Sequence, residues 1–275
     1  MGPSAVRVAN LGPRIRLLGA EVQDRGNVLV DQPESLPSTR GQKSKYLPQI
    51  ARTCERLSKS VQDALAKGFF PLVLGGDHSI AVGTVTGVAA HYRKSDREIG
   101  VIWVDAHTDM NTPETSPSGN VHGMPLACLL GHGPSKLVSL GGFEPKLKAR
   151  NVALVGIRDV DTLERNNVRE TGVHVYTMRD IDERGLGAVM QDAILAACDG
   201  TAGFHLSLDM DGVDPQEAPG VITYREAHFA MELLADSGRM LSMEVVEVNP
   251  VMDEQNRTAL LAVDLVLSAL GKRIL

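Results

Sequence analysis

The chain has 275 residues, of which 43% are hydrophobic and 23% are charged, and its formal net charge is −6. A chain of this length can bury a large core, and we expect one domain over residues 1–275. The acidic balance argues against a nucleic-acid or anionic-membrane surface, and no apolar run is long enough to predict a membrane span. The sequence begins without an apolar signal segment, so we expect a soluble, cytoplasmic protein. Its three cysteines form no CxxC pair, so we expect no disulfide framework.

Six apolar runs alternate with stretches of helical period along the chain. The predicted strands are FPLVLGG, IGVIWVDA, NVALVGI, VHVYT, FHLSLDM and MLSMEVVEV. The predicted helices cover residues 47–67, 79–91, 185–198, 223–236 and 256–271. Strands that alternate with helices are typical of βαβ units, and strands that are apolar on both faces are typical of a sheet covered on each side. The sequence therefore predicts an α/β fold with a mostly parallel sheet.

The segment VIWVDAHTDM, residues 101–110, runs from an apolar strand into three residues that commonly bind metal ions. Side chains at i, i+2 and i+4 of an extended chain point the same way, so Asp105, His107 and Asp109 are predicted to converge. They also follow the carboxyl end of a strand, where open α/β sheets bind their ligands. Taken singly, Asp105 as a helix cap, His107 as a packed residue and Asp109 as a solvated one remain alternatives.

Two more predicted strands end in residues of the same kind. Asp209 and Asp211 in FHLSLDMDGVDP form a second acidic pair, and LVLGGDHS places His78 at the start of a helix. Four carboxylates at one sheet edge would repel one another unless cations were present. Taken alone, GGDHS has another interpretation, in which Asp77 caps the helix and His78 is a satisfied polar residue.

The combined set of candidate metal ligands is His78, Asp105, His107, Asp109, Asp209 and Asp211. It is too large for one tetrahedral zinc ion and contains no cysteine, so it favours two divalent ions bridged by carboxylates. Oxygen-rich ligands with one nitrogen for each ion favour Mn²⁺, while Fe²⁺, Co²⁺ and Zn²⁺ remain alternatives. Two ions about 3.5–4 Å apart lower the pKa of a bridging water toward ~7, which indicates hydrolysis.

The motifs GGDHS, DAHTD and SLDMDGVDP together resemble the metal motifs of the ureohydrolases, and within them of the arginases, in order and approximate spacing. The resemblance extends from MGPSAVR to the C-terminal helix. It implies a three-layer α/β/α fold of the arginase and deacetylase type with two Mn²⁺ ions per chain. One ion would be bound by His78, Asp105, Asp109 and Asp209. The other would be bound by Asp105, His107, Asp209 and Asp211, so that Asp105 and Asp209 bridge.

The loop NTPETSPSGNVHGMP resembles the arginases and differs from the agmatinases, so the resemblance implies L-arginine as the substrate. The residues that would bind its α-carboxylate are Asn111, Ser116 and Ser118. The segment GIRDVDTLE would bind its α-ammonium, in part through water. The residues that would do so are Asp159, Asp161 and Glu164. Polar donors and acidic groups suit an amino-acid head group. As an alternative, RDVDTLE simply begins a solvated helix with acidic residues.

Two further residues match catalytic positions of the family, which implies hydrolysis of L-arginine to L-ornithine and urea by a metal-bridging hydroxide. His122 in NVHGMP would pass a proton to the leaving amine, and Asp109 would orient the hydroxide. Glu247 in MEVVEVNP would hold the substrate guanidinium; Glu244 falls earlier in the strand and is the weaker candidate. A plain loop histidine and an ion pair between Glu247 and an arginine remain alternatives.

The sequence departs from the family pattern in two places. The family has a further strand ahead of MGPSAVR and a GTPxxGG-like active-site loop ahead of ITYRE, so we expect this chain to lack that first strand and the loop after Gly220. An agmatinase or other guanidino-acid hydrolase, a zinc deacetylase and an inactive metal-binding relative are the competing interpretations. A homo-oligomer, trimer or hexamer, is expected from the resemblance.

Overall fold

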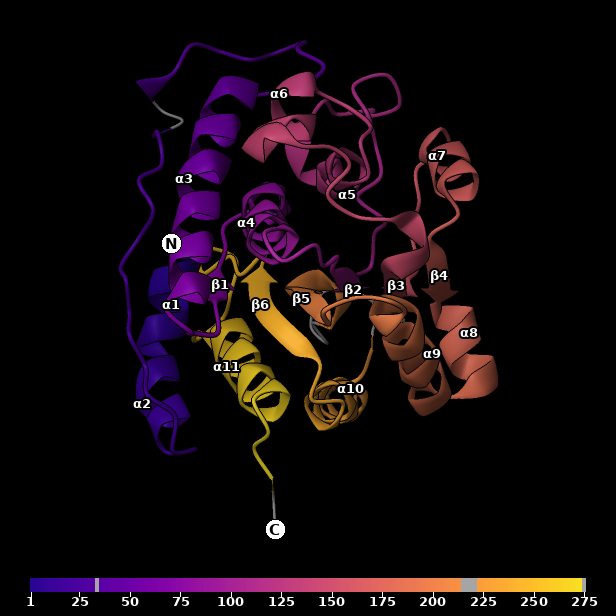
Figure 1. The fold of residues 1–275 in the computed structure, drawn as a ribbon. Helices are drawn as coiled ribbons and strands as arrows, with labels where there is room; N and C mark the ends of the chain where they lie inside the picture. Colours follow the sequence, from indigo (N-terminus) through magenta and orange to yellow (C-terminus); the bar gives the residue numbers. More distant parts are fainter. Residues whose placement is uncertain (33–34, 214–221, 274–275) are drawn as a thin grey trace.

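A six-stranded parallel sheet forms the middle layer of the computed structural model, which describes residues 1–32, 35–213 and 222–273 (Figure 1). The strands are β1 Leu72–Leu74, β2 Gly100–Val104, β3 Val152–Ile157, β4 His174–Thr177, β5 Phe204–Asp209 and β6 Met240–Val246. Their order is β1-β6-β5-β2-β3-β4, and every neighbouring pair is parallel. All six carboxyl ends therefore lie at the same edge of the sheet.

Helices cover both faces of this sheet, which confirms the predicted three-layer α/β/α fold (Figure 1). The helices of one layer are α1 Gly2–Val8, α2 Leu11–Arg16, α8 Met178–Arg184, α9 Leu186–Cys198, α10 Tyr224–Asp236 and α11 Arg257–Ala269. The opposite layer contains α3 Leu47–Ala66, α4 Ala81–Arg93, α5 Pro125–Leu129, α6 Ser135–Val138 and α7 Glu164–Thr171. Short 3₁₀ turns are η2 His78–Ile80, η3 Val121–Gly123, η4 Leu140–Gly142, η5 Ala149–Asn151 and η6 Met210–Gly212.

Each predicted strand contains one observed strand, and the five predicted helices correspond to α3, α4, α9, α10 and α11. The other helices are four to eight residues long, too short for an apolar period to identify them. Of the leucines in α11, Leu261, Leu265 and Leu267 are buried, whereas Leu260 is 44% exposed. Asp264 of the same helix is ion-paired with Arg14 of α2.

None of the described helices combines the length and the apolar character needed to cross a bilayer. The edge strands of the described sheet are β1 and β4, and α1 is the first element of the chain. The expectation of a missing loop after Gly220 concerns residues 214–221, which lie outside the described part of the structure.

Candidate metal centre and active site

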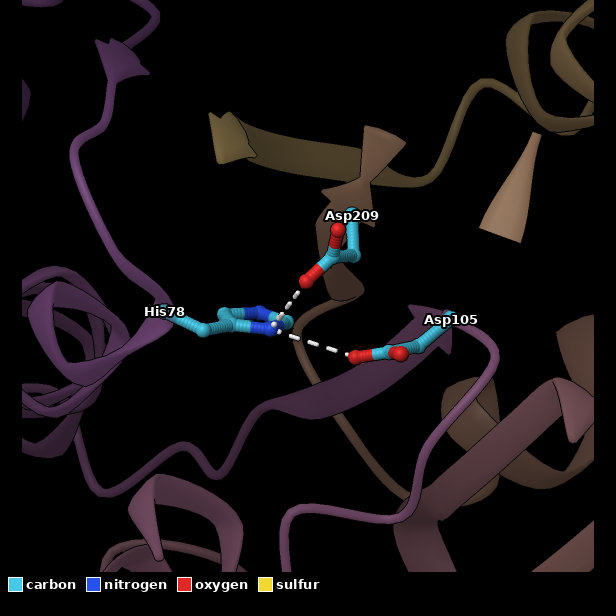
Figure 2. Close-up of side chains that lie close together, drawn as sticks. All are labelled: His78, Asp105 and Asp209. Carbon is cyan, nitrogen blue, oxygen red and sulfur yellow. Dashed lines mark ion pairs between the residues drawn. The ribbon is translucent and has the colours of Figure 1, made fainter. Parts of the chain in front are cut away.

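The candidate ligands come together at the carboxyl edge of the sheet, because the strands that precede them are parallel neighbours. Asp105 directly follows β2, and Asp209 is the last residue of β5. His78 follows β1 after two glycines and begins η2. Figure 2 shows the His78 imidazole between the carboxylates of Asp105 and Asp209, which come from two neighbouring strands.

His78 is the centre of a buried group of four. Its Nδ1 atom lies 3.2 Å from Asp105 Oδ2, 3.0 Å from Asp109 Oδ2 and 3.1 Å from Asp209 Oδ2. All four residues are buried. His78, Asp105 and Asp209 each offer one atom within 4.8 Å of the others, a spacing that fits a single metal ion.

A second group of potential ligands shares Asp105 with the first. His107 Nδ1 lies 3.1 Å from Asp211 Oδ2 and 3.5 Å from Asp105 Oδ1. These three residues also offer atoms within 4.8 Å of one another. The His107 side chain is half exposed, so this second group opens toward solvent. Two overlapping groups with a common carboxylate match the ligand pattern expected for a pair of ions.

Hydrogen bonding around His78 shows why a cation fits the buried group. Its Nε2 atom lies 2.7 Å from Ser207 Oγ, and the single hydroxyl hydrogen of Ser207 is donated to Glu244 Oε1 at 2.9 Å. Nε2 must therefore be the donor to Ser207, which leaves a lone pair on Nδ1 of the neutral imidazole. Nδ1 is buried without a hydrogen-bond partner among the described residues, although three carboxylates face it. Burial lowers the pKa of His78, but the three carboxylates raise it well above its ordinary value, so in the metal-free protein a proton on Nδ1 takes the place that a metal ion would occupy.

The pKa values of the cluster reflect the same crowding of charge. Burial and the charge of Asp105 raise the pKa of Asp109 to about 7, and the same causes raise the pKa of Asp209 well above its ordinary value. Hydrogen bonds to Asp105 and Asp211 raise the pKa of His107 to about 11. Without ions, the site therefore holds protons that divalent cations would replace.

Neighbouring groups fix the ligands in place. Trp103 Nε1 donates to Asp105 Oδ2 at 2.9 Å, and the indole stacks on the His78 ring with centroids 4.1 Å apart. The His107 backbone N–H donates to Asp105 Oδ1 at 2.7 Å. Asp109 has a left-handed backbone, with φ at 52°, and its carbonyl oxygen accepts from the N–H groups of two residues in α5. Such strain persists only where the surroundings impose it, and it is frequent at functional sites.

Glu247 and His122 lie beside the buried group. Glu247 Oε1 accepts from the His78 backbone N–H at 2.9 Å and lies 3.4 Å from His122 Nδ1. The contact with Glu247 raises the pKa of His122. Glu247 also has a left-handed backbone, with φ at 59°, directly after β6. An ion pair between Glu247 and an arginine, the alternative interpretation of this residue, is absent from the described residues; its ion-pair partner there is His122.

The expected substrate residues occupy two loops that contact each other. Asn111 Nδ2 donates to Asp161 Oδ2 at 2.9 Å, which joins the loop after β2 to the loop after β3. Ser116 Oγ and Ser118 Oγ accept from backbone N–H groups within the first loop. The Asp159 backbone N–H donates to Ala106 O.

Glu164 differs from the other acidic residues of its loop, because it is buried and its carboxylate already has partners. It accepts from Thr108 Oγ1 at 2.5 Å, from Met110 N at 2.7 Å and from Asp161 N at 3.2 Å. It is also the first residue of α7, so the alternative interpretation of RDVDTLE is right about a helix start here but wrong about a solvated Glu164. Its carboxylate therefore connects the loop after β2 to the loop after β3 by hydrogen bonds.

Sequence reasoning missed several polar residues behind the ligands. Trp103 lies in a strand predicted to be apolar and Ser207 in the strand that precedes Asp209, and no contact of either with a metal ligand is predicted from the sequence. His205 and Glu244 are fully buried on β5 and β6, strands that were expected to be largely apolar on both faces. The available signal was the alternation of His, Ser and Asp in FHLSLDM and of Ser and Glu in MLSMEV, which places polar side chains on one face of each strand.

Comparisons with known proteins agree with this geometry. The Arginase family model matches residues 1–271. An arginase from Brevibacillus brevis is 47% identical over 282 residues, with 100% of this chain and 93% of the relative covered. Crystal structures of arginases from Bacillus caldovelox and Bacillus subtilis superpose with TM-scores of 0.94 and 0.91 at 45% and 46% identity, again covering 100% of this chain and 93% of each. The chain belongs to the arginase family.

Proposed function

We propose that this chain hydrolyses L-arginine to L-ornithine and urea with two Mn²⁺ ions bound at the carboxyl edge of the sheet. The observation that carries the proposal is the pair of ligand groups that share Asp105, with Glu247 beside them. The family assignment and the arginase names of the relatives support the same activity.

The residues that would hold the ions fall into two sets. The buried ion would be bound by His78, Asp105, Asp109 and Asp209. The more exposed ion would be bound by Asp105, His107, Asp209 and Asp211. When bound, two such ions lower the pKa of a water between them toward ~7, so that hydroxide is available at neutral pH. Oxygen-rich ligands with one imidazole for each ion favour Mn²⁺.

Substrate binding would use charge complementarity at both ends of arginine. Glu247 would accept the guanidinium, because a planar cation can pair with a carboxylate through two hydrogen bonds. The residues that would donate to the α-carboxylate are Asn111, Ser116 and Ser118. Asp159 and Asp161 would face the α-ammonium, with Glu164 contributing negative charge from behind them. The contact between Asn111 and Asp161 supports this division, since it joins the two loops at one place.

Proton transfer would fall to His122 and orientation of the attacking water to Asp109. The half-exposed His122 imidazole lies next to Glu247, so it can reach both solvent and a guanidinium held there. Protonation of the departing amine by such a group contributes about 10²–10⁴-fold to the rate. The oxygen of the attacking water would form a bond to the guanidinium carbon, and a proton from His122 to the ornithine nitrogen would let the bond between that nitrogen and the carbon break, which releases urea and ornithine without a covalent enzyme intermediate.

The deciding experiment is reconstitution of the metal-free protein with Mn²⁺, followed by metal counting and a urea assay with L-arginine and agmatine. We expect two ions per chain and turnover of arginine far above that of agmatine. Preferred turnover of agmatine would favour the agmatinase alternative. One ion per chain would contradict the binuclear site, and two ions without urea would indicate an inactive relative.

We also propose that residues 1–275 form one catalytic domain in a cytoplasmic homo-oligomer. The single sheet with helices on both faces supports one domain. The thiols of Cys54 and Cys128 are buried and unpaired, which suits a reducing compartment. Light scattering would determine the number of subunits.

A further inference from the structure

A line of polar side chains crosses strands β5 and β6 behind the candidate metal centre. His205 and Ser207 on β5 lie opposite Ser242 and Glu244 on β6, in register. All four are fully buried. Residues that alternate with them, such as Leu206 and Met243, belong to the hydrophobic core on the other face of the sheet. Polar groups buried in this way are costly unless each has a partner, so their pairing needs a physical account.

Hydrogen bonds join His78, Ser207 and Glu244 in this line, and His205 lies at ion-pair distance on the far side of Glu244. His78 Nε2 donates to Ser207 Oγ at 2.7 Å, and Ser207 donates to Glu244 Oε1 at 2.9 Å. On the other side, His205 Nε2 lies 3.3 Å from the same carboxylate oxygen, and His205 Nδ1 lies 2.8 Å from Ser242 Oγ. Glu244 therefore lies between Ser207, which contacts the candidate metal ligand His78, and the buried imidazole of His205.

The charge of Glu244 determines which group donates and which accepts in the hydrogen bonds of this line. Burial opposes ionisation of the carboxyl, but the neighbouring His205 outweighs it and, with smaller effects from His78 and Thr84, lowers the pKa of Glu244. An ionised carboxylate only accepts hydrogen bonds, so Ser207 must donate to Glu244 and accept from His78. The alternative orientation, in which Ser207 donates to His78, would place a hydrogen on Nδ1 of the neutral imidazole. That atom is the one that faces Asp105, Asp109 and Asp209.

Neither Glu244 nor His205 belongs to the two groups of potential metal ligands among the described residues, so a direct ligand role does not explain them. A purely structural role also fits poorly, because Glu244 Oε2 is buried and lacks a hydrogen-bond partner within the described residues. Hydrogen-bond partners of metal-binding histidines commonly set the ring tautomer and orientation, and their loss costs about 10–100-fold in metal affinity.

We propose that Glu244 and His205 are positioning residues that act through Ser207 to hold His78 in the tautomer and orientation required to bind a divalent cation. The inference rests on the proposed metal centre and deepens it. It predicts that the Mn²⁺ affinity of the site at His78 depends on the contacts of Glu244 and His205 through Ser207. The affinity of the site at His107 and Asp211 should depend on them much less.

The test is a double-mutant cycle with Mn²⁺ binding as the readout. Glu244→Gln, Ser207→Ala and the double variant are titrated with Mn²⁺ alone by calorimetry and by electron paramagnetic resonance, which reports free ions and coupled pairs. We expect each single variant to weaken the tighter-held buried ion about 10–100-fold. The double variant should be no weaker than the weaker single variant, because Glu244 acts through Ser207.

Met243→Ala is the matched control, since it removes a fully buried side chain from the same strand on the opposite face. It should lower the midpoint of urea unfolding while both Mn²⁺ affinities stay within twofold of wild type. His205→Gln, which leaves Ser207 and Glu244 in place, should weaken the same ion even if Glu244→Gln fails to fold.

Wild-type affinity in Glu244→Gln, additive losses in the double variant, or equal weakening of both ions would overturn the positioning role. If Glu244→Gln does not fold, wild-type affinity in His205→Gln overturns it. Failure of the wild-type protein to bind Mn²⁺ would instead contradict the proposed metal centre, so the two failures are distinguishable.

Discussion

Asp209 is the residue whose charge should matter most for metal binding, because it is buried and faces His78 at 3.1 Å. Asp209→Asn keeps the shape of the side chain and an oxygen for the Asp211 backbone N–H, but it removes the negative charge. We predict that the variant retains at most one Mn²⁺ and loses arginase activity. Metal analysis after gel filtration measures this, with Asp236→Asn at the surface as the control for carboxylate removal. A variant with two tightly bound ions would refute the assignment of Asp209 as a bridging ligand.

His122 should separate catalysis from metal binding, because it pairs with Glu247 and none of its described hydrogen bonds or ion pairs is with a candidate metal ligand's side chain. Its imidazole lies 3.4 Å from Glu247 Oε1 and is half exposed. We predict that His122→Ala keeps the full metal content and reduces kcat about 10²–10⁴-fold, the usual contribution of a positioned general acid. Steady-state urea formation beside metal analysis checks both parts. Unchanged kcat, or loss of metal, would contradict the proton-transfer role.

At the level of elements, the site depends on how closely α9 packs against the start of β2. A Cβ added to Gly100 would lie 2.0 Å from the carbonyl oxygen of Ala197, a backbone atom that cannot rotate away. We predict that Gly100→Ala lowers the free energy of unfolding by about 1–3 kcal/mol, the usual cost of overpacking. Urea unfolding measures the change. Gly76→Ala is the control, because its added Cβ would meet no atom within 4 Å. Equal effects of the two substitutions would refute the packing argument.

The elements also show what the sequence can and cannot reveal about the site. Strand-end motifs in a parallel sheet predict convergence, because topology alone brings residues such as Asp105 and Asp209 to one edge. The buried pair of Glu244 and His205 was not predicted, because it depends on the register between β5 and β6, which no single strand encodes. Two partners of the Glu164 carboxylate, Thr108 and Met110, were equally hidden, since they come from a loop more than fifty residues away in sequence.

At the level of the whole molecule, proton binding should couple the stability of the metal-free protein to pH. The pKa of Asp109 is raised from 3.8 to about 7, and that of His107 from 6.5 to about 11. Both groups bind protons more tightly in the folded chain, so their contribution is complete below the unfolded pKa and is lost as pH rises through the folded one. For Asp109 the loss spans pH 3.8 to about 7, and for His107 it spans pH 6.5 to about 11.

Metal binding should reverse this trend, because the ligands must release those protons before they coordinate an ion. Between pH 6.5 and 8.5 we therefore predict that the urea midpoint falls in the presence of a chelator, while the apparent Mn²⁺ affinity rises. For each proton released on binding, the apparent Mn²⁺ affinity rises by up to about tenfold per pH unit. Bound ions also stabilise the fold, by an amount that grows with the logarithm of the ratio of free Mn²⁺ concentration to Kd. Calorimetry in buffers of different ionisation enthalpy counts the released protons directly. Binding without proton release would mean that the ions enter a site other than the one formed by His78, His107 and their carboxylates.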